Sequence, residues 1–356
     1  MLNRRALFKQ ARAAAAALLA PAARAYDAPL LFERARRNRR RKAEAAWAQF
    51  RQGFVSSDGR VVDTGNQRIS HSEGQGVAML AAALMEDESS FDLLWKWTRA
   101  TLLREDGLLS WKYEPGKGVT DRNNASDGEL YVVWALHEAA QTFSRPELFS
   151  EGARIARALR ETCVVETPRH GTMLLPGQHG FVTHFADQTP DIAVNPSYWV
   201  FPALAIAQDL DPSSAWERLR DNGLDMLRPA RFGRHKLPAD WLRLTHPVMP
   251  WPQRPARFGW EAIRIPLFLY WAGHHRHPTL VRFARFAAKP GFPAWVDFDD
   301  LKQADYAAPP GFEAVAQLAR HAAYGQPALL PSVSKDYFSS SLTLMAHLAH
   351  LSSVSL

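Results

Sequence analysis

Apolar residues recur at every third or fourth position along most of this 356-residue chain, which is the period of an α-helix with one buried face. Clusters of Pro and Gly interrupt the pattern and mark turns. Strand signals are short and weak, near residues 107–113 and 164–175. We therefore expect an all-α fold in a single closed domain, although helix count alone also allows an irregular bundle. The pattern predicts helices at residues 35–51, 73–85, 89–103, 128–142, 147–162, 197–208, 212–227, 261–274, 279–288, 311–323 and 336–350.

Two carboxylates stand where a polar turn gives way to a helical pattern. Glu73 follows Ser72, and Asp127 follows the polar run that begins at Asn124. Side chains at such positions point out of a helix end, so two of them can converge on one cleft, as acid–base chemistry on sugars requires. A simpler interpretation stays open, because Ser and Asn cap helices and acidic residues in a first turn complement the helix dipole.

Five short motifs occur in a fixed order with wide spacing: Gly59-Arg60-Val61-Val62-Asp63, Ser72-Glu73-Gly74-Gln75, Ala125-Ser126-Asp127-Gly128-Glu129-Leu130, Asn195-Pro196-Ser197-Tyr198-Trp199 and Glu261-Ala262-Ile263-Arg264. Together they resemble glycoside hydrolase family 8, and within it the periplasmic endoglucanases that accompany bacterial cellulose synthase. The resemblance runs from about Trp47 to about His350. It implies an (α/α)6 barrel and an inverting endoglucanase that hydrolyses β-1,4-glucan.

The resemblance also implies roles for the carboxylates. Glu73 stands at the family's proton donor, and Asp127 at a second acidic residue that contacts the distorted sugar and stabilises positive charge in the transition state. An inverting enzyme needs a further, ionised carboxylate that activates water on the opposite face of the ring. Close relatives read Tyr-Asp-Ala-Ile-Arg where this chain reads Trp260-Glu261-Ala262-Ile263-Arg264, so Glu261 is the candidate general base.

The change from Asp to Glu at this position leaves two interpretations of Glu261. The extra methylene could shift the attacking water, and a misplacement of about 1 Å can cost on the order of a hundredfold in rate. Alternatively, Glu261 is only an acidic residue at a helix start, and the chain is a catalytically weak glycan-binding barrel.

Flat aromatic side chains are expected in a glucan cleft, because the C–H face of a sugar stacks on them. Trp111, Tyr198 and Trp241 resemble family positions near the scissile bond, and Arg264 matches a residue that lines the same site. Other β-1,4-linked polymers, namely chitosan, xylan and mixed-linkage glucan, need the same carboxylates, so the substrate stays open. Trp95, Trp97 and Trp271 lie in apolar helical patterns, and we expect them in the core.

The N-terminus reads as an export signal. Residues 1–10 are basic, residues 13–22 are small and apolar, and Ala23-Arg24-Ala25 forms an A-x-A cleavage site. We expect residues 1–25 to be a signal peptide and residues 26–356 to be a periplasmic or secreted catalytic domain. Arg4-Arg5 resembles a twin-arginine signal, although the general secretion route stays open. The apolar run is too short to span a bilayer, so we expect no stable membrane insertion.

The formal net charge of +7 is concentrated near the N-terminus. Residues 1–25 hold five basic and no acidic residues, and residues 34–42 hold seven basic ones. Residues 43–356 carry 31 basic and 34 acidic side chains, so the body lacks the basic footprint of a nucleic-acid-binding protein. For residues 34–42 we expect a solvated helix face, with contact to anionic lipid or polysaccharide as the second interpretation.

No other motif in the sequence indicates a cofactor or a metal ion, and we expect neither. The sequence has no G-x-S-x-G, no P-loop and no dinucleotide fingerprint. The run His274-His275-Arg276-His277 and the pair His347 and His350 lack carboxylate or thiol partners at ligand spacing, so they are interpreted as solvated or capping histidines. A single cysteine, Cys163, excludes an intramolecular disulfide. The sequence thus predicts an exported glucanase whose partner is β-glucan, and the resemblance implies a functional link to a cellulose synthase system.

Overall fold

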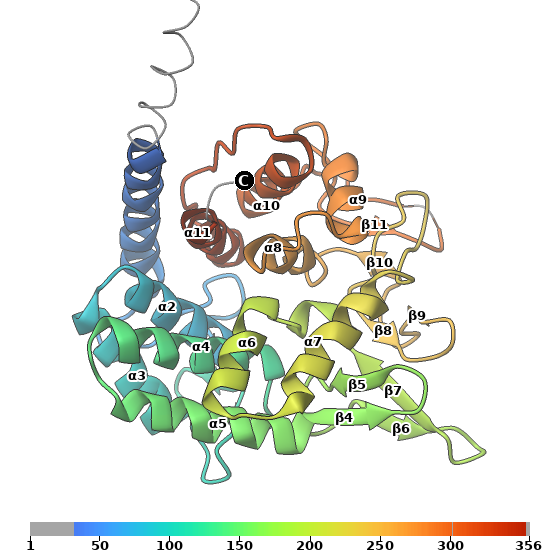
Figure 1. Cartoon of the computed structure of the whole chain (residues 1–356), viewed down its shortest axis with the longest axis horizontal. Helices are drawn as coiled ribbons and strands as arrows, with labels where there is room; N and C mark the ends of the chain where they lie inside the picture. The colour runs from blue at the N-terminus through green and yellow to red at the C-terminus, as the bar shows by residue number, and fades with distance from the viewer. Residues whose placement is uncertain (1–31, 301, 354–356) are drawn as a thin grey trace, which may run out of the picture.

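The computed structural model describes residues 32–300 and 302–353. Paired helices follow one another around a ring, with small sheets at its edge (Figure 1). The predicted signal peptide, residues 1–25, lies outside the described residues. The helices are residues 32–54, α2 Ser72–Leu84, α3 Glu88–Thr101, α4 Ser126–Thr142, α5 Glu147–Cys163, α6 Phe201–Leu210, α7 Ser214–Leu227, α8 Arg264–Trp271, α9 Pro278–Phe286, α10 Pro310–Tyr324 and α11 Tyr337–Ser352, with a 3-10 turn at Pro196–Tyr198.

The ring has two layers because its helices differ in how much of their surface is apolar. Helices α2, α4, α8 and α11 are buried on nearly every side and, with α6, contact one another around the inside. Helices α3, α5, α7, α9 and α10 each bury one stripe and pack outside. The two-layered helical ring confirms the predicted all-α class.

Two glycines allow α2 and α4 to approach closely. A Cβ on Gly76 would lie 2.6 Å from the Tyr131 Cβ, and one on Gly128 would lie 2.1 Å from the Ser72 Oγ. Any larger residue would therefore push the two helices apart. This contact sets the start of α2 directly beside the start of α4, and the two predicted acidic residues stand at these starts.

Short strands shape the loops at one end of the ring. They are β1 Ser70–His71, β2 Lys112–Glu114, β3 Gly118–Asp121, β4 Val164–Thr167, β5 Gly171–Leu174, β6 Val182–His184, β7 Pro190–Val194, β8 Leu242–Arg243, β9 Met249–Pro250, β10 Arg257–Phe258 and β11 Val296–Asp297. They form sheets ordered β1-β2-β3, β4-β5, β6-β7-β8-β9 and β10-β11, all with antiparallel pairs. The weak strand signals fell on β2, β4 and β5, and the remaining strands were not predicted.

Several expectations about where helices start and which residues cap them are wrong. Helix α8 begins at Arg264, so Glu261 lies in the turn before the helix and is not a helix-start residue. Ser72 does not cap α2; the His71 side chain does, by accepting a hydrogen bond from the Gly74 N–H. Helix α4 has no side-chain cap at all, and Asn124 instead contacts the buried interior.

Among the expected core tryptophans, Trp95 is buried and Trp97 and Trp271 are half-buried against the core. Within residues 32–300 and 302–353 no three His, Cys, Asp or Glu side chains lie together so as to hold a metal ion. In the histidine run, His277 caps the start of α9 by accepting a hydrogen bond from Thr279 N–H. Among the same residues, no helix has the length and apolar character needed to cross a membrane.

Candidate active site

A cleft of about 230 Å³ opens at the end of the ring where α2, α4 and α8 begin. Six of the seven residues predicted for the site line it, although they are spread over 192 positions of the sequence from Glu73 to Arg264. The full lining is Asp63, Asn66, Ile69, His71, Ser72, Glu73, Trp111, Ala125, Asp127, Tyr198, Glu261, Arg264, Tyr337, Phe338 and Ser341.

Glu73 occupies the first turn of α2, and two contacts fix that turn. The Ser72 N–H donates to the Trp111 carbonyl at 3.1 Å, which ties the helix start to the loop before β2. The His71 Nδ1 accepts from the Gly74 N–H at 3.0 Å and satisfies one of the free helix donors. The Glu73 side chain stays partly accessible from the cleft, with 21% of its surface exposed.

Asp127 lies deeper than Glu73 and is buried at the start of α4. Its Oδ1 accepts a hydrogen bond of 2.9 Å from the Gly128 N–H. Burial raises the pKa of Asp127 well above its usual value, and the charge of Glu73 raises it further, against the opposing effect of Arg264. The shift favours the protonated form of this buried carboxyl.

Glu261 lies across the cleft in a turn that Asp240 organises. The Asp240 Oδ1 accepts backbone N–H bonds from Gly259 at 2.9 Å, Glu261 at 3.3 Å and Ala262 at 2.9 Å. The Glu261 Oε2 accepts from the Asn195 Nδ2 at 3.1 Å. Asp240 thus fixes the backbone of the turn, and Asn195 orients the carboxylate.

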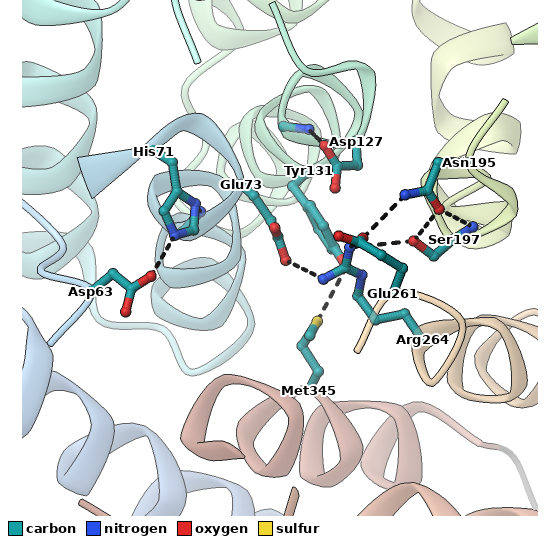
Figure 2. Close-up of polar contacts among 12 residues, drawn as sticks. Asp63, His71, Glu73, Asp127, Tyr131, Asn195, Ser197, Glu261, Arg264 and Met345 are labelled. Carbon is teal, nitrogen blue, oxygen red and sulfur yellow. Dashed lines mark hydrogen bonds and ion pairs between the residues drawn. The ribbon is translucent and has the colours of Figure 1, made fainter. Parts of the chain in front are cut away.

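Arg264 connects the two sides of the cleft. Its Nη1 donates to the Glu73 Oε1 at 3.4 Å, and its Nη2 donates to the Glu261 Oε2 at 2.5 Å and to the Ser197 Oγ at 3.2 Å. Figure 2 shows the guanidinium between the two glutamates. The side chain is only 5% exposed, so water screens these contacts weakly. Arg264 therefore positions both carboxylates, beyond the sugar contact predicted for it.

The predicted aromatic residues fall into two groups. Trp111 and Tyr198 line the cleft itself. Trp241 is not among the lining residues, but its ring centroid lies 6.1 Å from that of Tyr198 and it stacks on Phe181 at 5.9 Å. Trp251 adds a fourth ring 5.7 Å from Trp241. The rings together form an aromatic surface that continues from the cleft over β6 to β9.

Comparison with known proteins identifies the family to which this chain belongs. The family model described as glycosyl hydrolases family 8 matches residues 29–351. The chain belongs to this family. Membership makes the chain a glycoside hydrolase and confirms the predicted (α/α)6 barrel class.

Three family 8 relatives illustrate the degree of similarity. A probable endoglucanase of Novacetimonas hansenii is 36% identical over 314 residues, which cover 85% of this chain and 89% of the relative. An endoglucanase of Cellulomonas uda is 33% identical over 283 residues, covering 78% and 77%. The solved structure of an endo-beta-1,4-glucanase from Acetobacter xylinum has a TM-score of 0.80 at 35% identity, covering 86% of this chain and 97% of that one.

Sequence reasoning did not assign a role to several residues of this family 8 cleft. The His71 Nε2 lies 3.7 Å from the Asp63 Oδ2, and Figure 2 shows this pair on the side of Glu73 away from Arg264. Tyr337 reaches the cleft from α11, and a Cβ on Gly74 would lie 2.3 Å from its hydroxyl. Asp63 falls inside one of the five motifs and could have been singled out there. Tyr337 follows the polar run Ser334-Lys335-Asp336, whose Asp336 caps α11, but it lies in none of the five motifs.

Proposed function

We propose that this chain is an inverting endo-β-1,4-glucanase acting on cellulose-like glucan. The observation that carries the proposal is the convergence of Glu73, Asp127 and Glu261 on one cleft, with Arg264 bonded to both glutamates. Relatives that share a third of the sequence over most of its length are named endoglucanases, which supports the choice of polymer.

In this proposal Glu73 protonates the leaving glycosidic oxygen. It is the more exposed of the two carboxyls at the starts of α2 and α4, so it is the one that substrate can contact. Asp127 lies behind it, and burial together with the charge of Glu73 raises the pKa of Asp127. When a sugar ring fills the cleft, Asp127 hydrogen-bonds it and Glu73 delivers the proton.

On the opposite side Glu261 acts as the general base. Arg264 and Asn195 both bond its Oε2, and among the described residues no bond to its Oε1 is present. Oε1 is therefore free to accept a proton from water on the far face of the sugar, as inversion requires. The extra methylene relative to Asp is accommodated because the turn held by Asp240 fixes where the longer side chain starts.

The test is hydrolysis of carboxymethylcellulose, chitosan and xylan, measured as reducing ends, with product anomers followed by proton NMR. We expect release from carboxymethylcellulose and the α-anomer as first product. Release from chitosan or xylan alone would move the substrate to that polymer. A β-anomer as first product would contradict inversion, and binding without release from any polymer would favour a glycan-binding barrel.

We further propose export to the periplasm, where the enzyme would meet a growing glucan chain made by a cellulose synthase system. The basic start, the apolar stretch and the Ala23-Arg24-Ala25 site support export. In a Gram-negative host the mature protein should begin near Tyr26. Replacing Arg4 and Arg5 together by Lys should block export by the twin-arginine route, and unimpeded export would assign the general route. A periplasmic protein whose intact mass includes Met1 would contradict cleavage.

A further inference from the structure

A second pocket, which shares no residue with the cleft, is lined mostly by cations. Its volume is about 310 Å³, and it lies between the turn after α7 and the second half of α9. No acidic residue is among those that line it. The lining residues are Arg231, Arg234, His235, Lys236, Arg282, Arg285 and Phe286.

Backbone geometry gathers these charges from two elements. Phe232 and Leu237 exchange N–H bonds with each other's carbonyls at 2.8 and 3.2 Å, which closes a tight turn. Lys236 within that turn has a left-handed backbone with φ of 55°, a conformation that costs free energy for a residue with a Cβ. The turn thereby sets Arg234 and Lys236, with Arg231 just before it, beside α9, where Arg282 and Arg285 stand three residues apart on one face.

The positive charge of this pocket is not neutralised by the protein. Within the described residues none of its four arginines or Lys236 forms an ion pair, whereas neighbouring Arg228 and Lys302 each pair with an aspartate. The Arg282 Nη1 is buried and has no hydrogen-bond partner among the described residues. Burial lowers the pKa of Arg282, and the charges of Arg231 and Arg285 lower it further. Cations at the end of α9 complement the helix dipole, but that accounts for neither the charges on the turn nor the unpaired buried N–H.

We propose that this pocket binds a phosphate-type dianion. Guanidinium groups present paired N–H donors that match the oxygens of phosphate, and an anion seated between Arg231, Arg282 and Arg285 would satisfy the free Nη1 and offset the repulsion among the cations. The volume suits inorganic phosphate or pyrophosphate, or the phosphomonoester headgroup of a lipid. The inference does not depend on the polymer that the cleft hydrolyses.

Calorimetric titration of the full chain with pyrophosphate at 150 mM total ionic strength, roughly physiological, tests the proposal. We expect saturable binding at one site and a higher melting temperature than in sodium chloride of equal ionic strength. The variant Arg231→Gln/Arg285→Gln should bind at least about tenfold more weakly, because two exposed cations at the pocket mouth are lost. The matched control is Lys96→Gln/Arg99→Gln, which removes the same charge from exposed positions on α3.

The outcomes separate the proposal from a general effect of charge. Equal weakening in both double variants, or no saturable binding by the unmodified chain, would overturn the proposal that this pocket binds an anion. Flotation with phosphatidylcholine vesicles containing phosphatidic acid identifies the source of the anion. Vesicle binding that pyrophosphate displaces assigns a lipid headgroup, and pyrophosphate binding without vesicle binding assigns a free anion. Hydrolysis of soluble glucan should be unchanged in both double variants, which shows that they are folded.

Discussion

Arg264 links Glu73 and Glu261, the proposed acid and base, into a single electrostatic unit. It bonds Glu73 through one terminal nitrogen and Glu261 through the other, and it is itself buried. A buried cation between carboxylates stabilises their negative charge strongly, because little water screens the interaction. The 3.4 Å contact to Glu73 is the longer and therefore the weaker of the two. The geometry thus holds the Glu261 carboxylate more firmly than the Glu73 carboxylate, whose side chain is freer to turn toward a substrate.

Replacing Glu73 by Gln should remove proton donation while keeping the size of the side chain. Turnover of an unactivated polymer should fall by about 10²–10⁴-fold, the usual contribution of general acid catalysis. Affinity for oligosaccharide should stay within a few fold of the unmodified enzyme, which calorimetry can measure. Near-normal turnover in Glu73→Gln would remove this residue from the mechanism.

Two substitutions at Glu261 decide whether it is the base. Glu261→Gln should nearly abolish turnover and leave oligosaccharide affinity roughly unchanged, because an amide cannot accept the proton from water. Glu261→Asp should retain or raise activity, since the family pattern that this chain resembles has Asp at this position. The two variants need turnover and affinity measured side by side. An active Glu261→Gln would show that another group activates the water.

At the scale of elements, the turn that carries Glu261 depends on a carboxylate about 20 residues away. Asp240 accepts three backbone N–H bonds from that turn and is 4% exposed, and burial raises its pKa to about 6. Asp240→Ala would leave those donors unsatisfied and free the turn, so we expect kcat to fall at least about tenfold.

The variant Asp240→Asn separates positioning of the turn from charge. Its amide oxygen can still accept the three N–H bonds, so it should recover most of the turnover lost in Asp240→Ala. Circular dichroism of both variants checks that the barrel is intact. Equal loss in the two variants, or a change in KM alone, would contradict a positioning role.

The same turn shows what local sequence patterns could and could not predict. Most helices were found because their apolar period reports a buried face directly. The start of α8 was placed at Glu261, three residues early, because the competing hydrogen-bond acceptor Asp240 is distant in sequence. The strands were mostly missed because elements of two to five residues are too short to show an alternating pattern.

The candidate site was also only partly predictable from the sequence. Glu73, Asp127 and Glu261 stand in recognisable motifs beside polar turns, so their type and position were accessible from sequence. Their convergence required the close packing of α2 on α4, which rests on Gly76 and Gly128. Tyr337 enters from the last helix, and only ring closure brings it to the cleft.

At the scale of the whole molecule, the first and last described helices meet and help close the ring. The Arg39 Nη1 donates to the carbonyls of His350 and Ser353, both at 3.2 Å, and so satisfies the end of α11. The basic run was expected to be a solvated helix face, and Arg34, Arg36 and Arg37 are indeed exposed. Arg39 departs from that expectation because the end of α11 supplies free carbonyl acceptors.

Buried carboxyls should also shape how the stability of the whole barrel depends on pH. Glu129 is fully buried, accepts bonds from the Leu109 N–H at 2.8 Å and the Asn124 Nδ2 at 3.0 Å, and burial raises its pKa from 4.5 to about 7. The folded state therefore binds a proton between these pH values that the unfolded state releases, so stability falls as pH rises through this window. At about 1.4 kcal/mol per pKa unit, the loss attributable to Glu129 is on the order of 3 kcal/mol.

The measurement is the free energy of unfolding in urea at several pH values from about 4.5 to 7.5, for the unmodified chain and for Glu129→Gln. The amide cannot ionise, so the advantage of the unmodified chain over the variant should shrink steadily as pH rises and should be smallest above pH 7. Glu105→Gln, at an exposed position, is the matched control and should follow the unmodified chain. Asp127 and Asp240 also have raised pKa values, so part of the fall with pH should remain in Glu129→Gln. A difference between the chain and Glu129→Gln that is constant with pH would show that Glu129 is ionised in the folded barrel throughout, and its bonds to Leu109 and Asn124 would then outweigh its burial.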